Sequence, residues 1–484
     1  MKFIGIDIGT TGCKATLFDQ EGNELSSDYI EYSLDIISST EIEQNALDWW
    51  NNTVISVRKI LQKSNTSKKE VKGISISSQS ITVVPVDKDC NPLCAAISWL
   101  DTRAAKQAVE LLECYCQEEM FQLTGKRINA AYTLPKLMWL KENKPEIFFK
   151  AHKFLMPHDF VYAKLTGKFY TDHSLSSGTL MYNIKDQCWQ SNILEKYKID
   201  IAQLPRIAWS GTHVESLCKS AQKELGLSDE VMVTVGGQDQ KVAAFGAQLT
   251  LGNGTISLGT AGAIEILTKS IVLDKDMGIP CFSYMNKGEW VLEAVIPTVG
   301  ASIKWLRNTL YEKFSYEGLT EQAGKSTIGS NGLFYFPHLT GTGSPRWKSD
   351  TLGMYYGISL STKSEDFVRA NFEGIAYQIK ENIDRIRKLG LQVKELILFG
   401  GGSKSKVWCD IIANTTGVRV SSYFTPDIAI LGAAKLAAIG CGIGTHEFGS
   451  ASLDNKNIYN PSQSKVELYK SLYTDYQNLQ NKYY

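Results

Sequence analysis

One short motif occurs twice in this chain, 250 positions apart, and it constrains the fold more than any other feature. Residues 7–12 read DIGTTG and residues 257–262 read SLGTAG, and the two align without a gap. In both places apolar side chains alternate around the Gly-Thr turn, which is typical of two antiparallel strands joined by a turn. We therefore predict two similar domains, residues 1–246 and 247–484, with the boundary near Ala247.

Helical and strand patterns alternate outside these turns. Residues 364–389 carry apolar side chains at three- and four-residue steps, which predicts a long amphipathic helix that ends at Gly390. A strand over 393–399, a glycine run and a second helix ending at Gly417 follow it. In the first half, residues 134–143 predict a helix that Pro145 stops. The predicted fold class is therefore α/β.

Composition excludes several classes of protein. Hydrophobic residues at 43% and charged residues at 21% are typical of a globular chain, and the formal net charge of zero gives no reason to expect a nucleic-acid partner. The chain contains no run of 18 uncharged apolar residues, so no membrane span is predicted. Asp7 lies where a signal peptide would need apolar residues, so no signal peptide is predicted. The 10 cysteines form no CxxC pair. We expect a cytoplasmic protein with reduced thiols, bound to neither membrane nor nucleic acid.

Three glycine-rich turns predict a nucleotide site. Backbone N–H groups in such turns bind phosphates, because no side chain blocks the approach. The candidate residues of the two repeated turns are Gly9, Thr10, Thr11, Gly259 and Thr260. The third turn joins a strand to a helix and comprises Gly400, Gly401, Gly402 and Ser403. The chain has neither a GxxxxGK[ST] nor a GxGxxG motif, so neither a P-loop nor a Rossmann site is predicted.

Two acidic residues end predicted strands beside glycines. Asp7 either accepts hydrogen bonds from its turn or binds Mg²⁺, and we favour the metal, with Asp239 as a second carboxylate for it. Asp239 follows an apolar strand and two glycines just before the predicted boundary. A carboxylate in that position can accept the proton of a hydroxyl that attacks phosphorus.

The polar segment 99–103, which follows a predicted strand and a turn at Pro92, is a candidate sugar site. Asp101 and Arg103 either form a surface ion pair or bind a polyhydroxylated substrate, and Gln79 and Ser80 are candidates for the same role. The pair His158-Asp159 follows Pro157, and we interpret it as the start of a helix rather than a proton relay.

These motifs resemble the FGGY carbohydrate kinases, and the resemblance covers nearly the whole chain. Residues 7–11 and 257–260 are similar to the two phosphate loops of that family. Residues 136–143 fit one family signature, and residues 353–358, 366–367 and 370–373 nearly fit another, apart from Asn371. The resemblance implies two RNase H-like domains, as in the actin, Hsp70 and hexokinase superfamily, closing a cleft on ATP and sugar.

The resemblance also implies roles for the candidate residues. Asp239 corresponds to the catalytic base and Asp7 to the acid near Mg²⁺. Thr260 would lie near the phosphates, and residues 400–403 against the adenosine. The implied activity is ATP-dependent phosphorylation of a sugar hydroxyl, with possible homodimer formation.

The acceptor is less well defined. Gln79 followed by Trp99-x-Asp101-x-Arg103 is similar to the branch that phosphorylates D-xylulose, although Ser80-Ile81-Thr82 replaces the Met-His-Gly usual there and removes a sugar contact. The alternatives are another ketose, a sugar acid such as gluconate, or a polyol such as glycerol or erythritol; the Arg-Glu pair of glycerol kinases is missing. A non-catalytic ATP-dependent conformational switch is the alternative of another class. The Tyr-rich segment 469–484 is predicted to be a helix that docks on the core or on a partner.

Overall fold

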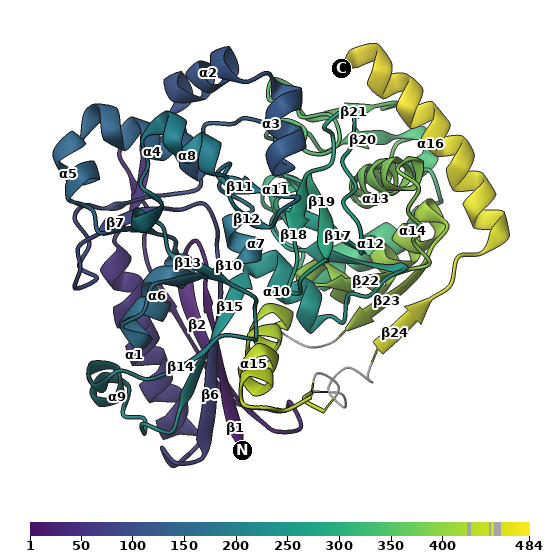
Figure 1. Cartoon of the computed structure of the whole chain (residues 1–484). Helices are drawn as coiled ribbons and strands as arrows, with labels where there is room; N and C mark the ends of the chain where they lie inside the picture. The colour runs from purple at the N-terminus through teal and green to yellow at the C-terminus, as the bar shows by residue number, and fades with distance from the viewer. Residues whose placement is uncertain (424–426, 445–446, 450–455) are drawn as a thin grey trace.

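The computed structural model describes residues 1–423, 427–444, 447–449 and 456–484, and it contains two large mixed sheets (Figure 1). The first sheet has the strand order β14-β15-β6-β1-β2-β3 and the second has β18-β19-β17-β16-β22-β23-β24. The strands of the first sheet are β1 (Lys2–Ile8), β2 (Gly12–Asp19), β3 (Glu24–Glu31), β6 (Val71–Ser78), β14 (Val214–Ser216) and β15 (Met232–Gln238). Those of the second are β16 (Asn253–Leu258), β17 (Gly262–Thr268), β18 (Cys281–Ser283), β19 (Trp290–Ile296), β22 (Glu395–Phe399), β23 (Arg419–Tyr423) and β24 (Lys456–Tyr459).

The two sheets share one topology. In the first, β3, β2 and β1 form an antiparallel meander, and β6 and β15 continue the sheet parallel to β1. In the second, β19, β17 and β16 form the meander, and β22 and β23 continue it parallel to β16. Each repeated Gly-Thr turn joins the first two strands of its meander. The predicted α/β class and the duplicated architecture are therefore confirmed.

The predicted helices are present with nearly the expected bounds. The structure has α4 at Thr133–Asn143, α13 at Ser364–Lys388 and α14 at Lys406–Thr416. The remaining helices of eight or more residues are α1 (Ala46–Lys63), α2 (Ala105–Cys114), α3 (Gln117–Thr124), α6 (Pro157–Thr166), α10 (Asp239–Gly246), α11 (Gly300–Leu310), α12 (Tyr316–Lys325), α15 (Ile428–Gly440) and α16 (Gln463–Tyr483). Asp159 caps α6 by accepting from the Met156 N–H at 3.0 Å. The fully buried His158 ring accepts from the Gly236 N–H of β15, so this pair joins a helix to the first sheet.

Helix α15 connects the two halves of the chain. It follows β23 of the second sheet in sequence, yet it packs against β1, β6 and β15 of the first sheet and against α10 (Figure 1). Glycines allow these close approaches: a Cβ atom on Gly5 would lie 2.3 Å from the Ile430 carbonyl oxygen, and one on Gly432 would lie 2.1 Å from that of Val242. The position near Ala247 lies between the strands of the two sheets, and α15 shares a hydrophobic cluster with Ile397 and Phe399 of the second sheet.

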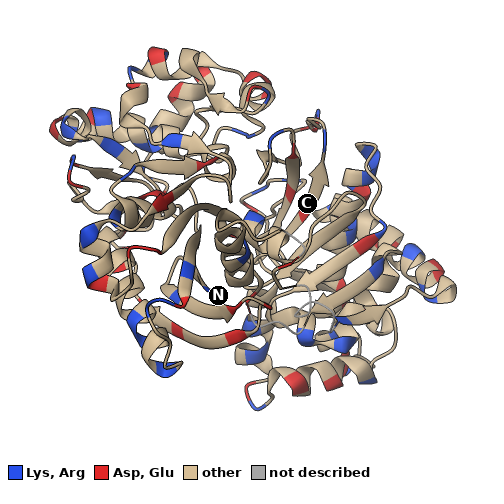
Figure 2. Ribbon diagram, turned by 60° about the horizontal axis from the view of Figure 1, so that its bottom comes forward, with Lys and Arg blue, Asp and Glu red and all other residues tan. Residues whose placement is uncertain are grey.

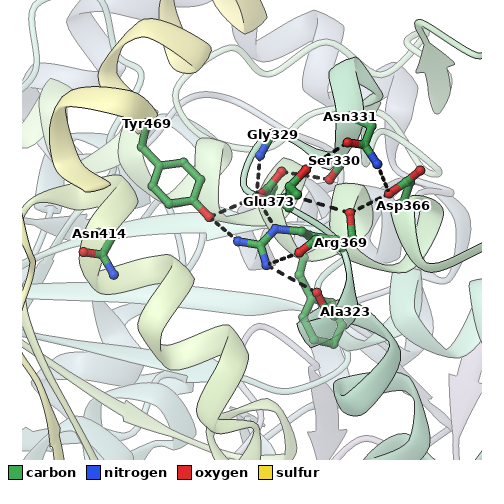
Figure 3. Close-up of polar contacts among 12 residues, drawn as sticks. Ala323, Gly329, Ser330, Asn331, Asp366, Arg369, Glu373, Asn414 and Tyr469 are labelled. Carbon is green, nitrogen blue, oxygen red and sulfur yellow. Dashed lines mark hydrogen bonds and ion pairs between the residues drawn. The ribbon is translucent and has the colours of Figure 1, made fainter. Parts of the chain in front are cut away.

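The C-terminal Tyr-rich helix, α16, docks on the core of its own chain. Its Tyr469 hydroxyl bonds the Glu373 carboxylate and the Arg369 guanidinium of α13, each at 2.9 Å (Figure 3). Glu373 also accepts from the Gly329 N–H and the Ser330 hydroxyl, so this buried acid is fully paired. Of the alternatives for this segment, docking on the core is the one observed.

The surface and the cysteines agree with the composition. In the view of Figure 2, lysine and arginine positions are interspersed with aspartate and glutamate positions over both halves of the ribbon. All 10 cysteines are free. In the described part of the chain, no helix combines the length and apolar character needed to cross a bilayer.

Candidate active site

Asp239 lies where the first sheet meets α10. It directly follows β15 and is the first residue of α10, and its Oδ1 accepts from the Gln238 Nε2 at 2.6 Å and the Gln240 N–H at 2.7 Å. Burial raises the pKa of Asp239 to about 6, against the lowering effects of the Gln240 N–H and the Lys241 charge. A carboxylate with this pKa is ionised at neutral pH and still has an appreciable affinity for a proton, as a general base requires.

Asp7 is the penultimate residue of β1, opposite Lys14 of β2. Its Oδ1 accepts from the Ser77 hydroxyl at 2.7 Å. Burial, together with the negative charges of Asp427 and Asp239, raises the pKa of Asp7 to about 8. Two other carboxylates therefore act electrostatically on Asp7.

This arrangement suits Mg²⁺. Mutual repulsion of buried carboxylates is relieved by a cation, and Mg²⁺ usually takes one or two carboxylates, the remaining ligands being water and substrate phosphates. Within the described ranges no three His, Cys, Asp or Glu side chains form a complete metal cage. Asp7, with Asp239 nearby, is therefore the donor set that fits a metal arriving with a nucleotide.

The second and third glycine-rich turns lie against each other. They follow the parallel neighbours β16 and β22, in which Ser257 is paired with Phe399. Gly400 has a φ of 87°, and a Cβ atom there would lie 3.0 Å from the Leu258 carbonyl oxygen. The Ser403 hydroxyl donates to the Gly400 carbonyl at 2.8 Å, so it closes its own turn. Gly259, Thr260, Gly400 and Gly401 are exposed, which leaves their backbone groups accessible to a ligand.

A closed ring of hydrogen bonds joins the first Gly-Thr turn to the candidate sugar site. Gln44 Nε2 donates to the Thr10 carbonyl at 2.7 Å, and Gln79 Nε2 donates to Gln44 Oε1 at 2.9 Å. The Thr82 hydroxyl donates to Gln79 Oε1 at 3.4 Å and accepts from the Trp99 N–H at 3.0 Å. Trp99 Nε1 then donates to the Thr10 hydroxyl at 2.9 Å. Gln79 uses one of its two amide N–H donors here, so the other remains for a ligand hydroxyl.

Asp101 and Arg103 form an ion pair, and it is buried rather than on the surface. Arg103 Nε donates to Asp101 Oδ2 at 2.8 Å, and Nη1 bonds Glu43 at 2.8 Å, with only 4% of the Arg103 side chain exposed. Asp101 also accepts from the Ile42 N–H at 2.6 Å. The ion pair thus links the segment 101–103 to residues 42 and 43. The neighbouring Ser80 is half-buried beside Gln79.

Two further charged groups near the site were not predicted. The Lys14 ammonium bonds Asp427 Oδ2 at 3.0 Å, which joins the first turn to the start of α15. The strand alternation after Gly12 could have indicated that Lys14 lies opposite Asp7. Nothing local in the sequence indicates Asp427, because it reaches the site only through the packing of α15.

A buried ion cluster lies next to Asp239. Lys241 Nζ bonds Glu265 Oε1 of β17 at 3.1 Å and Glu293 Oε2 of β19, and its side chain is fully buried. Glu265 and Glu293 are direct cross-strand partners. The helix that begins with Asp239 is therefore fastened to the strand that leaves the second Gly-Thr turn.

Comparisons with known proteins identify relatives over nearly the whole chain. The FGGY family of carbohydrate kinases, N-terminal domain, matches residues 2–246, and its C-terminal domain matches residues 254–441. The chain is 31% identical to the xylulose kinase of Bacillus subtilis over 99% of this chain and 97% of that protein. It is 25% identical to the gluconokinase of Bacillus subtilis over 98% of this chain and 95% of that one. The crystal structure of ligand-bound xylulose kinase from Lactobacillus acidophilus covers 99% of this chain and 98% of its own, with a TM-score of 0.92 at 23% identity, which shows the fold.

Proposed function

The chain belongs to the FGGY family of carbohydrate kinases, and from that premise we propose that it transfers the terminal phosphoryl group of ATP to D-xylulose, giving D-xylulose 5-phosphate. The observation that carries the choice of acceptor is the higher identity to a full-length xylulose kinase than to a full-length gluconokinase. The phosphotransferase activity itself follows from the family.

Asp239 is the proposed base. As the acceptor hydroxyl oxygen bonds to the terminal phosphorus, the bond from phosphorus to the bridging oxygen of ATP breaks and ADP leaves. The hydroxyl proton passes to the Asp239 carboxylate. Phosphoryl-transfer transition states are loose, so positioning contributes more than base strength does, and a pKa near 6 is sufficient.

The three glycine-rich turns supply the proposed nucleotide contacts. Gly9, Thr10 and Thr11 on one side and Gly259 and Thr260 on the other offer backbone donors to the phosphates. The third turn, Gly400 to Ser403, lies against the second and offers a surface free of side chains to the adenosine. Mg²⁺ held by Asp7 and Asp239 would neutralise phosphate charge.

The proposed sugar contacts are Gln79 and Ser80. The hydrogen-bond ring fixes the Gln79 amide relative to Thr10 of the first phosphate turn, so acceptor and phosphate positions are coupled. The buried Asp101–Arg103 pair supports the proposal that these two residues orient the sugar site.

The test is an ATP-consumption assay with Mg²⁺ and a panel of D-xylulose, other ketoses, D-gluconate, glycerol and erythritol. We expect D-xylulose to give the highest kcat/KM. Asp239→Asn should lower kcat by about 10²- to 10⁴-fold while ATP still binds. Asp229→Asn removes an exposed carboxylate of the same domain and should leave kcat unchanged.

Each result has a distinct meaning. A different compound with the highest kcat/KM would replace D-xylulose and keep the kinase. Full activity of Asp239→Asn would remove the base assignment. ATP binding without turnover of any acceptor would favour the non-catalytic switch.

A further inference from the structure

The backbone beside Gln79 contains a strained turn. Ile81 has a φ of 55°, and the Thr82 N–H donates to the Ser80 carbonyl at 2.8 Å, which makes residues 80–82 a γ-turn of the less favoured hand. Among the non-glycine residues with positive φ in the described ranges, Ile81 is the only β-branched one. A β-branched side chain is the least compatible with this conformation, so the surrounding structure must impose it.

A buried lysine holds this turn. Lys136 of α4 donates through Nζ to the Ile81 carbonyl at 3.0 Å and to the Ser98 carbonyl at 2.7 Å. Its side chain has no exposed surface, and it forms no ion pair with any described residue. Burial lowers the pKa of Lys136 to about 7. A buried amine without a carboxylate partner is costly, and an apolar side chain would pack there at lower cost.

The strained turn lies within the hydrogen-bond ring. Gln79 precedes the turn, and Thr82, which bonds Gln79 and Trp99, ends it. Ser98, the second partner of Lys136, precedes Trp99 directly. Lys136 Nζ therefore joins the two backbone segments that carry the ring.

The Ile81 side chain has a defined place of its own. It is half-buried, and its Cγ2 would lie 3.2 Å from a Cβ atom built on Gly178, with Phe282 behind at 3.8 Å. The absence of a side chain at Gly178 leaves room for it. The Ile81 side chain thus packs closely against residue 178.

We propose that Lys136 is a positioning residue of the acceptor site, which holds the strained turn at Ile81 so that Gln79 and the Ile81 side chain face the sugar. The proposal rests on the proposed function for its acceptor, but the coupling between Lys136 and Ile81 does not. Glycine adopts positive φ without strain. A glycine at position 81 should therefore no longer need the lysine.

The experiment is a double-mutant cycle of wild type, Lys136→Met, Ile81→Gly and the double variant. Thermal unfolding without ligands measures the coupling. We expect Lys136→Met to lower the melting temperature strongly with Ile81 present and only weakly with glycine there. Equal decreases in both backgrounds would overturn the proposal.

Steady-state kinetics on the same four proteins separate positioning from a general loss of structure. With D-xylulose, or the panel compound that the wild type phosphorylates best, Lys136→Met should raise the acceptor KM by about tenfold or more. The KM for ATP should stay within about twofold. A parallel rise of both constants would overturn the positioning role. Lys141→Met is the control: this lysine lies on the same helix, donates to the Tyr197 carbonyl and lies over the Phe148 ring, and its replacement should change neither constant.

Two further outcomes keep the tests separate. If Lys136→Met does not fold, Ile81→Gly alone decides: an acceptor KM at the wild-type value would overturn the proposal, and a raised one with an unchanged ATP KM supports it. If the wild type phosphorylates no panel compound, the proposed function fails. The double-mutant cycle of melting temperatures still tests whether Lys136 stabilises the turn at Ile81.

Discussion

Each Gly-Thr turn joins two antiparallel strands of its sheet, but the two turns differ in side-chain chemistry. The first is flanked by Asp7 and Lys14, which face each other across β1 and β2. In the second turn Ser257 aligns with Asp7, and its cross-strand partner is Ala263. The charged side chains proposed to interact with a metal and with phosphates are therefore concentrated at the first turn. The second turn offers uncharged backbone groups.

The turns are also held in different ways. Side chains hold the first: the Tyr32 hydroxyl donates to the Gly9 carbonyl at 2.5 Å, and Gln44 and Trp99 bond Thr10. Backbone holds the second: the Gly300 N–H at the start of α11 donates to the Gly259 carbonyl at 2.8 Å. Side chains therefore link the first turn to the proposed sugar site, and a backbone hydrogen bond links the second turn to α11.

The largest expected difference between the two turns is the loss of stability when the lysine near each turn is replaced. Lys241 is fully buried between Glu265 and Glu293, whereas the side chains of Lys14 and Asp427 are 24% and 31% exposed. Lys241→Met leaves two opposed buried carboxylates and should lower the free energy of unfolding by about 3–5 kcal/mol. Lys14→Met should cost about 1 kcal/mol or less. Chemical denaturation of the ligand-free proteins measures both.

A second set of variants tests the reason for that difference. Adding Glu265→Gln and Glu293→Gln to Lys241→Met removes the uncompensated charges, so most of the lost stability should return. If the triple variant remains as unstable as the single one, packing and not charge explains the effect.

The next prediction exchanges the acid of the first turn for its neutral isostere. Asp7→Asn should lower kcat by about 10²- to 10³-fold, because the carboxylate proposed for Mg²⁺ is lost. Ser257→Ala, at the equivalent position of the second turn, should lower kcat by less than about tenfold, because it removes only the acceptor of the Ala263 N–H. Equal losses in the two variants would show that the turns share the metal chemistry.

Much of this difference between the turns was accessible from sequence, and the reasons for the rest are physical. The repeat, the meanders and α13 follow from local alternation and helical periodicity, which short segments carry. Asp427, the partners of Lys241 and the Glu43 contact of Arg103 depend on tertiary packing across tens to hundreds of residues. The sequence also left Asp101 and Arg103 undecided between an ion pair and a ligand site, since burial cannot be inferred from charge alone. The roles of the site residues remain predictions for the experiments described here.

The pH dependence of stability should differ between the turns as well. The pKa of Asp7 is raised to about 8 in the metal-free protein, above its value near 4 in an unfolded chain. The folded state then holds a proton that the unfolded state has released, so the associated stability is present below pH 4 and is lost as the pH rises toward 8. In EDTA, wild type should lose stability relative to Asp7→Asn between pH 5 and 8, at most about 1.4 kcal/mol per pH unit. Ser257→Ala should follow the wild-type curve, and parallel curves for wild type and Asp7→Asn would contradict the assignment.

The smallest expected effect tests how the second turn is held. A Cβ atom on Gly300 would lie 2.5 Å from the Gly259 carbonyl oxygen, a backbone atom that cannot rotate away. Gly300→Ala should therefore displace the second turn at a cost of about 1–2 kcal/mol, seen as a rise of roughly tenfold in the KM for ATP. The acceptor KM should change little, because the hydrogen-bond ring beside the proposed sugar site is joined to the first turn and not to the second. Gly324→Ala lies in α12, where the nearest atom is 3.7 Å away, and serves as the control. An unchanged ATP KM in Gly300→Ala would mean that the second turn tolerates the shift, and that its contact with α11 does not define the nucleotide site.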